Sequence, residues 1–470
     1  MNFTCLKVAI GVTLMGMSGC SLIPEYHRPE APVQQSWNAP NVTSTDARQV
    51  TWQAVFKSEM LDDLISQALV NNRDLRVAAL NIEKAQAQYR IRKADLLPSI
   101  NASGSANSQR VPSDLSTTGN TQTTHEYTAG VGFTAYELDF FGRVRSLDQQ
   151  ALERYFSTVE AQRSVKVALI AQVASAYFQL QADQQLLAIS GQTLANQRDS
   201  FSLVKHSYEQ QVATELDLSQ AESTVRTAES AQAQYQRQVE QDKNALVLLV
   251  GKPLEAKYFT AIELDALPIE DNVPVGLPSD LLIARPDILA AEYALRAANA
   301  NVGAARAAFF PSITLTASAG SASSDLGQLF AGGQGAWAFV PSINVPIFNA
   351  GRNQANLDAA RIQTSIEVAN YQKTIQVAFR EVADSLVARE SLTTQVLAET
   401  RLVQANQRNY QLANSRYTEG VDTYLNTLDA QRNLFSAQQT LVSSKLSRIN
   451  NLVSLYKALG GGEGAEDSAQ

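Results

Sequence analysis

The chain of 470 residues has few helix-breaking residues over two long stretches. Residues 143–250 and 352–459 contain no proline, and each contains a single glycine, Gly191 in the first and Gly420 in the second. Each stretch can therefore be helical almost throughout, whereas a globular helix usually runs for about 8 to 20 residues. This distribution argues against an ordinary compact enzyme.

Cysteine, histidine and clusters of basic residues are also scarce. The two cysteines, Cys5 and Cys20, leave no basis for a disulfide framework, and the net charge of −8 without a basic cluster argues against nucleic acid as a partner. The histidines His27, His125 and His206 are too widely spaced to suggest a metal site, and no phosphate-binding loop or nucleophile motif is present. We therefore expect no catalysis, no metal and no cofactor, and we expect the histidines at the surface.

The N-terminus carries a short targeting pattern. Lys7 precedes an apolar run over residues 8–15, which is too short to span a bilayer, and small residues lead into Cys20. The sequence Met-Ser-Gly-Cys at residues 17–20 resembles a bacterial lipobox at the end of a secretory signal. Cys20 would then become the mature N-terminus and carry lipid such as palmitate, and Ser21 points to the outer membrane. A plain signal peptide or a short membrane anchor is the alternative.

Two β-hairpins are predicted, over residues 98–141 and 311–348. Their strands alternate apolar residues with small or polar ones, which at about ten residues is typical of a transmembrane β-strand facing a water-filled lumen. A half-exposed soluble hairpin would show the same alternation. In the return strand of the first hairpin the apolar face is predicted to comprise Tyr127, Ala129, Val131, Phe133 and Ala135.

The chain contains an internal duplication. The hairpins correspond at an offset of 213 residues, as Pro98 with Pro311, and the long stretches at an offset of 209. One matched position differs in charge, because Gln220 in the first copy corresponds to Asp429 in the second. Pairs identical at the offset of 209 include Tyr208 and Tyr417, Val212 and Val421, Leu216 and Leu425, Ala221 and Ala430, and Gly251 and Gly460.

Apolar residues recur every seven positions along each long stretch, which predicts left-handed packing of the helices. A helix from residue 143 to about 210 would be about 100 Å long at 1.5 Å per residue. In the first copy the repeating residues are Val173, Leu180, Leu187, Leu194, Phe201 and Tyr208. In the second they are Val382, Val396, Val403, Tyr410 and Tyr417, with Arg389 as the exception.

Four strands cannot cross a bilayer alone, because the open edges leave backbone groups without partners in hydrocarbon. Other chains must close the sheet. A dimer would give an eight-stranded barrel filled by side chains, whereas three or more copies would leave a lumen. Three copies, a homotrimer, would give twelve strands.

The chain resembles the outer-membrane factor family of tripartite efflux systems, most closely its OprM-like lipoproteins and more distantly TolC. The resemblance covers residues 50 to 462. It rests on NRDLR at 72–76, YELDFFGR at 136–143, GLPSDLL at 276–282, RPD at 285–287, GAARAAFFPSI at 303–313, LDAQR at 428–432 and LYKALGGG at 455–462.

The resemblance implies a mixed α and β membrane protein, with a twelve-stranded β-barrel in the outer membrane and a long periplasmic helical barrel. Its partners would be a periplasmic adaptor and an inner-membrane resistance-nodulation-division pump. The function implied is a passive duct that exports drugs or other small molecules and so contributes to antibiotic resistance. The alternatives are a protein-secretion duct working with an ABC exporter, and a periplasmic coiled-coil scaffold lipoprotein.

The resemblance also implies a periplasmic gate. Leu425 and Asp429, one helical turn apart, match positions that narrow the channel, and Tyr417 and Arg416 match positions that hold the closed tip by contacts to neighbouring helices. The alternative is that Leu425 is ordinary heptad core and Asp429 a solvated residue.

The predicted organisation follows from these patterns. It comprises a signal at 1–19, an extended tether at 20–57, a first repeat at 58–252, an irregular equatorial segment at 253–284, a second repeat at 285–462 and a tail at 463–470.

Overall fold

The computed structural model describes residues 21–34, 51–267, 275 and 278–462. The predicted signal, the predicted lipidation site Cys20 and the C-terminal tail lie outside the described residues. The strands are β1 (Asn101–Val111), β2 (Gln122–Leu138), β3 (Ser312–Ser323) and β4 (Gly335–Asn344). The helices are α2 (Trp52–Phe56), α3 (Glu59–Asn71), α4 (Arg73–Ala94), α5 (Arg143–Glu209), α6 (Glu215–Val250), α7 (Pro278–Ala284), α8 (Pro286–Ala307), α9 (Arg352–Thr418) and α10 (Tyr424–Ala458).

The chain divides into two structural units. One comprises residues 1–30, 81–159 and 290–371 and contains the strands; the other comprises residues 31–80, 160–289 and 372–470 and contains most of the long helices. None of the helices in the described residues is both long and apolar enough to cross a membrane.

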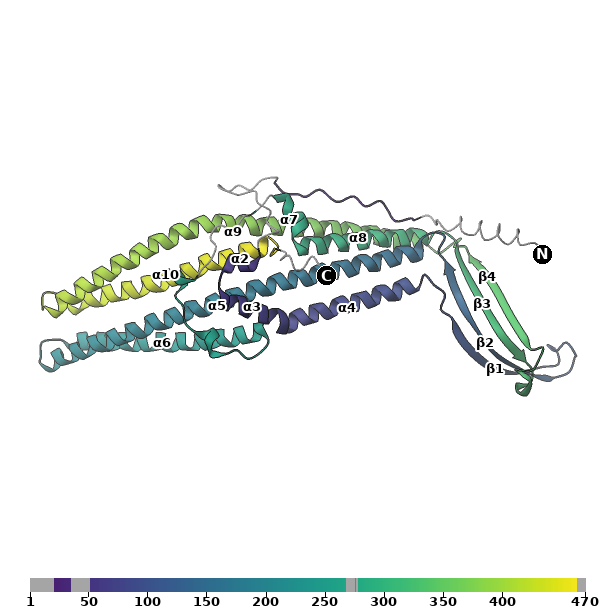
Figure 1. The fold of residues 1–470 in the computed structure, drawn as a ribbon, viewed down its shortest axis with the longest axis horizontal. Coiled ribbons are helices and arrows are strands. Elements are labelled where there is room, and N and C mark those ends of the chain that lie inside the picture. Colours follow the sequence, from purple (N-terminus) through teal and green to yellow (C-terminus); the bar gives the residue numbers. More distant parts are fainter. Residues whose placement is uncertain (1–20, 35–50, 268–274, 276–277, 463–470) are drawn as a thin grey trace. The chain divides into compact units, whose positions relative to one another are not determined.

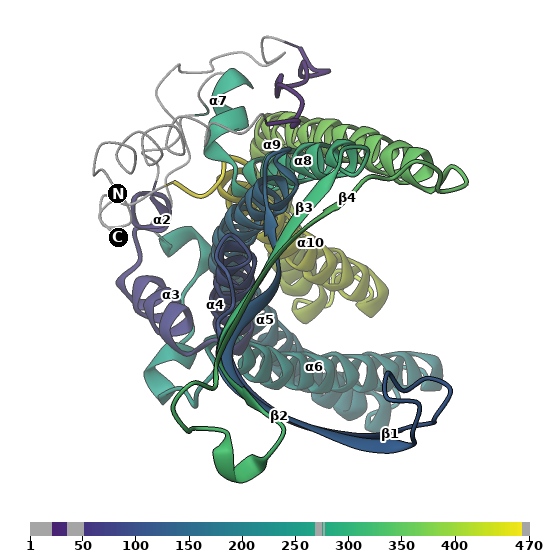
Figure 2. The same ribbon diagram turned by 90° about the vertical axis from the view of Figure 1, so that its right-hand side faces the viewer.

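The first unit contains one antiparallel sheet in the order β1-β2-β3-β4, so β1 and β4 are its edges. Figure 2 shows the four strands side by side in a curved sheet. The register aligns Val131 with Ala319 and Ala319 with Trp337, and it aligns Phe133 with Ala317 and Ala317 with Phe339. Because paired residues share a face, apolar side chains form rows across the strands. Several of them are exposed in the single chain, Trp337 at 79%.

A β-bulge corrects one detail of the predicted alternation. Phe133 pairs with Ala317 and Tyr136 with Leu315, so β2 contains one more residue than β3 in this interval. Tyr136 therefore joins the face of Phe133, and the rings lie 6.2 Å apart. Ala135, predicted on that face, is the extra residue, with φ of 53°.

Glycines allow the opposite face of the sheet to curve. A Cβ at Gly132 would overlap the carbonyl oxygen of Ala317, and one at Gly320 would overlap that of Ala129. At Gly104, in contrast, a Cβ would lie 3.8 Å from the nearest atom, an ordinary contact. The close approach of β2 and β3 thus requires glycine at specific positions.

The second unit contains two helical hairpins that repeat each other. We define the first arm as residues 160–250 of α5 and α6, and the second arm as residues 372–458 of α9 and α10 (Figure 1). Helices α5 and α9 each contain 67 residues and begin and end at the predicted offset of 209. Helices α4 and α8 each contain 22 residues and keep the offset of 213. The predicted duplication is therefore present in the backbone.

Two short helices differ from the sequence interpretation. The tether predicted over residues 20–57 is wrong at its C-terminal end, because residues 52–56 form α2. The Phe56 ring lies 6.1 Å from that of Phe178 and 5.7 Å from that of Tyr456, so tertiary packing fixes this single turn. Helix α7 lies in the segment expected to be irregular, which also contains the 3-10 helices η2 (Ala256–Phe259) and η3 (Leu264–Ala266).

Candidate functional site

The tip of the second arm is a tight turn between α9 and α10. Helix α9 ends at Thr418, and α10 begins at Tyr424. The carbonyl oxygen of Arg416 accepts hydrogen bonds from the N–H groups of Val421, at 2.8 Å, and Asp422, at 3.2 Å. These two bonds satisfy the Arg416 carbonyl near the helix end and fold the loop back onto α9.

The predicted gate residues lie just after this turn, on one exposed side of α10. Leu425 is 50% exposed, and Asp429, one turn further, is also exposed. Their sequence neighbours Tyr424 and Leu428 are buried on the adjacent side of the helix. Leu425 is therefore not core within this chain, contrary to the alternative considered for it. Within the described residues, Asp429 forms no ion pair.

The buried side of the tip packs on the first arm. Tyr424 and Leu428 of α10 form an apolar cluster with Val204 of α5 and Ala221 of α6. Tyr417 packs against this cluster, with its ring centroid 5.6 Å from that of Tyr424. Tyr417 thus links the two arms of one chain, and burial, followed by the nearby charge of Asp217, raises its pKa.

Arg416 contacts its own hairpin. Its Nε donates to Oδ2 of Asp422 at 3.2 Å, across the loop that joins α9 to α10. The carboxyl of Asp422 also accepts hydrogen bonds from the N–H of Thr423 and from Asn426 Nδ2. These hydrogen bonds, that of the Thr423 N–H first, lower the pKa of Asp422. The loop therefore favours the ionised carboxylate.

The first arm presents the same backbone without the acidic residue. Leu216, which corresponds to Leu425, is 65% exposed, and one turn later Gln220 stands in place of Asp429. Tyr208, which corresponds to Tyr417, is 39% exposed and is not among the residues of the tip cluster. The two tips therefore differ in charge and in how they pack.

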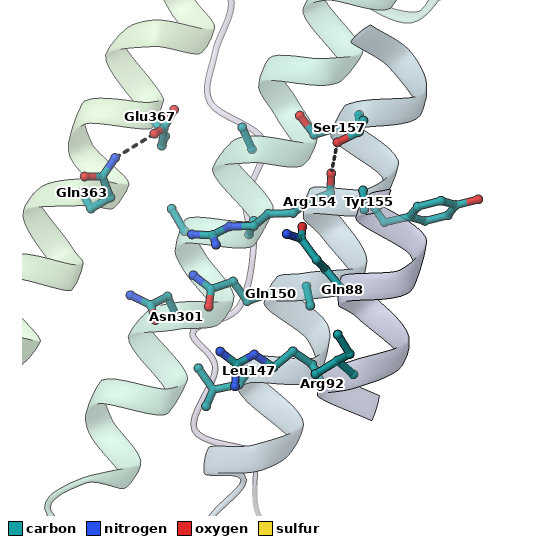
Figure 3. A pocket seen from close by; sticks show the side chains of 17 residues that line it. Gln88, Arg92, Leu147, Gln150, Arg154, Tyr155, Ser157, Asn301, Gln363 and Glu367 are labelled. Carbon is teal, nitrogen blue, oxygen red and sulfur yellow. Dashed lines mark hydrogen bonds between the residues drawn. The ribbon is translucent and has the colours of Figure 1, made fainter. Parts of the chain in front are cut away.

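A polar groove lies in the first unit, between α4, α5, α8 and α9 (Figure 3). Its volume is about 790 Å³, and Figure 3 shows side chains of several helices around it. Gln363 Nε2 donates to Oε1 of Glu367 at 2.8 Å. Guanidinium and amide groups of this kind bind polar solutes and water. Its labelled lining residues are Gln88, Arg92, Leu147, Gln150, Arg154, Tyr155, Ser157, Asn301, Gln363 and Glu367.

A buried carboxylate in the same unit binds the N-terminal segment to α8. Glu292, 3% exposed at its side chain, accepts hydrogen bonds from Arg28 Nη2 at 2.5 Å, Arg296 Nη2 at 2.6 Å and the Tyr26 hydroxyl at 3.2 Å. Burial acts to raise the pKa of Glu292, but the hydrogen bonds from the two arginines outweigh it and lower the pKa. The sequence analysis did not predict this cluster. The four-residue spacing of Glu292 and Arg296 indicates a pair on one helix face, but nothing local indicates the contacts with Tyr26 and Arg28.

The histidines are exposed, as expected. His125 contacts the Ser108 hydroxyl at 2.8 Å within the sheet. In the part of the chain that the structure describes, no group of three or more histidine, cysteine or acidic residues is placed to hold a metal ion.

Comparison with known proteins gives a consistent match over nearly the whole chain. The family described as outer membrane efflux protein matches residues 64–252 and 277–461. The toluene efflux pump outer membrane protein TtgC of Pseudomonas putida is 52% identical over 461 residues, which cover 97% of this chain and 95% of that protein.

Solved structures agree with the sequence match. A membrane protein from Pseudomonas aeruginosa superposes with a TM-score of 0.90 at 41% identity, covering 96% of this chain and 100% of the other. The open state of the MtrE outer membrane channel of Neisseria gonorrhoeae superposes with a TM-score of 0.85 at 38% identity, covering 94% of this chain and 98% of the other.

Proposed function

Because the chain belongs to the outer membrane efflux protein family, we propose that three copies form a passive duct whose periplasmic end is gated by the second arm. The family match confirms the resemblance predicted from the sequence, together with the outer-membrane location and the role as the channel component of an efflux pump. The trimer, the gate, the lipid anchor and the identity of the partners belong to the proposal.

The open edges of the four-stranded sheet are the main support for a trimer. Strands β1 and β4 are edges, and the apolar rows that include Trp337 and Phe339 are exposed in the single chain. Unpaired backbone groups are costly in hydrocarbon, so the edges must pair with other copies. Three chains of four strands give twelve, enough to enclose a lumen.

The gate follows from the same symmetry. Around a three-fold axis, Leu425 and Asp429 would each occur three times. A leucine ring closes by apolar contact, whereas three carboxylates repel one another and favour cations. Transport energy would come from a resistance-nodulation-division pump joined through a periplasmic adaptor, and the duct itself would catalyse nothing. The toluene pump relative favours small-molecule export over protein secretion.

Native mass measurement of the detergent-solubilised protein tests the assembly. We expect three chains per particle, resistant to dissociation until heated, because the sheet edges pair between subunits. A particle of one chain, or of two, would refute the twelve-stranded duct.

A further inference from the structure

A buried arginine joins three helices of the second repeat. Arg285 immediately precedes α8, and only 6% of its side chain is exposed. Its Nε and Nη2 donate to the two carboxylate oxygens of Asp287, at 3.0 and 2.7 Å. Its Nη1 donates to Glu381 Oε2 of α9, at 2.9 Å, and to the carbonyl oxygen of Ala458 at the end of α10, at 2.8 Å. One guanidinium thus connects both helices of the second arm to the start of α8.

The first repeat makes an equivalent connection, which we also call a joint, with a neutral residue in place of the arginine. Asn72 precedes α4 as Arg285 precedes α8, at the offset of 213. Asn72 Nδ2 donates to the carbonyl oxygen of Leu249 at 2.7 Å, and Leu249 corresponds to Ala458 at the offset of 209. Asn72 Oδ1 also accepts from the N–H of Leu75 at 2.9 Å. The connection to the end of the returning helix is therefore common to both repeats.

Glycine ends the returning helix at both joints. Gly251 and Gly460 have φ of 81° and 94°, in the left-handed region that favours glycine. A Cβ at Gly460 would lie 2.8 Å from the carbonyl oxygen of Ala284, and one at Gly251 would overlap that of Asn71. The end of α6 therefore packs against the junction between α3 and α4, and the end of α10 packs against the junction between α7 and α8.

The repeats differ in the link to the outgoing helix of each arm. Glu381 of α9 corresponds to Gln172 of α5, so the charged pair Arg285 and Glu381 replaces the neutral residues Asn72 and Gln172. The ionic joint belongs to the repeat that carries Asp429.

The contacts around Arg285 allow its ion pair with Glu381 to break without leaving the guanidinium unpartnered. Removing one partner of a buried pair is costly when it leaves a bare charge. Here Asp287 and the Ala458 carbonyl keep Arg285 partnered when Glu381 departs. The Glu381 side chain is 35% exposed, so water can solvate its carboxylate after separation.

We propose that the Arg285–Glu381 ion pair is a releasable link that sets the position of the second arm, while the neutral joint of the first arm stays fixed. Arg285 and Glu381 are positioning residues, since neither lies at the tip. The effect of their separation on the channel rests on the proposed function, because the second arm carries the proposed gate residues.

The test is a distance between the two tips within one chain. Spin labels are placed at Val212 and Val421, equivalent exposed loop residues of the two arms, in a full-length chain with both native cysteines replaced by serine. Labelled chains are diluted with unlabelled ones so that only distances within a chain are measured. The probe variant is Glu381→Gln. The matched control is Asp384→Asn, which removes an exposed carboxylate of α9 that lies 3.9 Å from the Arg380 guanidinium.

We expect Glu381→Gln to shift the 212–421 distance distribution to longer values and broaden it, and Asp384→Asn to reproduce the parent distribution. An unchanged distribution in Glu381→Gln, or the same shift in the control, would overturn the link. This distance does not depend on a closed pore or on a trimer, so its outcome is independent of the gate, which channel conductance tests separately.

Discussion

Single residues distinguish the two arms, although the arms share one backbone. An exposed leucine occupies the same place on both tips, as Leu216 and Leu425. One turn later the side chain is neutral in the first arm, Gln220, and acidic in the second, Asp429. Because each arm would occur three times in a trimer, Asp429 would add three carboxylates at a position where the first arms carry the neutral Gln220.

The Asp422 carboxyl should make the second tip sensitive to acid. Its pKa lies below the ordinary value of 3.8, so the stability it contributes is present above that value and is lost as the pH falls through the lower folded-state pKa. Protonation weakens the hydrogen bonds from Thr423, Asn426 and Arg416. We expect amide exchange at Val421 and Asp422, corrected for intrinsic rates, to accelerate between about pH 5 and pH 2.

The control for this titration is Asp422→Asn. It retains an oxygen acceptor but not the charge, so its exchange at the tip should already be fast at neutral pH and should change little with acid. Identical pH profiles in the parent and the variant would show that another group governs the loop.

The positions of the gate residues could be predicted from the sequence, but most of their contacts could not. Gly420 and the repeated offset locate the turn, and helical spacing puts Leu425 and Asp429 on one side. The packing of Tyr417 against Val204 and Ala221 joins residues about 200 positions apart, and no local pattern encodes it. For the same reason the sequence RPD at 285–287 contributed to the family resemblance, but the contacts of Arg285 with Glu381 and Ala458 could not be predicted from it.

At the level of elements, glycine controls how closely β2 and β3 approach. Gly132→Ala would place a methyl group against the carbonyl oxygen of Ala317, and strain of this kind costs about 1–3 kcal/mol. We expect the variant to yield less heat-resistant oligomer in outer-membrane fractions and to unfold at a lower temperature.

Gly104→Ala is the matched control, since its methyl group would make an ordinary contact at 3.8 Å. It should assemble like the parent protein. Equal losses in both variants would mean that glycine is needed for chain flexibility rather than for the approach of β2 and β3.

Long elements were predictable because their signals accumulate over many residues. The absence of proline and the seven-residue pattern predict α5 and α9, and the structure confirms both over 67 residues each. Helix α2 was missed because five residues carry no periodicity, and its stability comes from Phe56 packing on Phe178 and Tyr456. The bulge at Ala135 was missed because one extra residue changes the alternation locally.

For the molecule as a whole, lipidation of Cys20 would anchor the chain at the membrane. Residues 21–34 are described from Ser21 onward, and Glu292 binds this segment through Arg28 and Tyr26. We expect Cys20→Ser to abolish labelling by radioactive palmitate. Efflux can persist in this variant, because the Glu292 contacts and the sheet remain. Persistent labelling of the variant would refute lipidation at Cys20.

The proposed gate at the tip of the second arm would close the conducting trimer. Such a gate predicts an asymmetry between two equivalent pairs of residues: Leu425 and Asp429 on the second arm, and Leu216 and Gln220 on the first. Truncating Leu425 and Asp429 would remove the apolar side chains and the carboxylates of the proposed gate, whereas truncating Leu216 and Gln220 would alter only the first arm.

The most direct measurement is single-channel conductance of the purified protein in planar bilayers. Leu425→Ala combined with Asp429→Ala should raise the conductance severalfold over the parent channel, and Leu216→Ala combined with Gln220→Ala should leave it unchanged. Equal conductance of the first double variant and the parent, or an equal rise in both double variants, would contradict the gate.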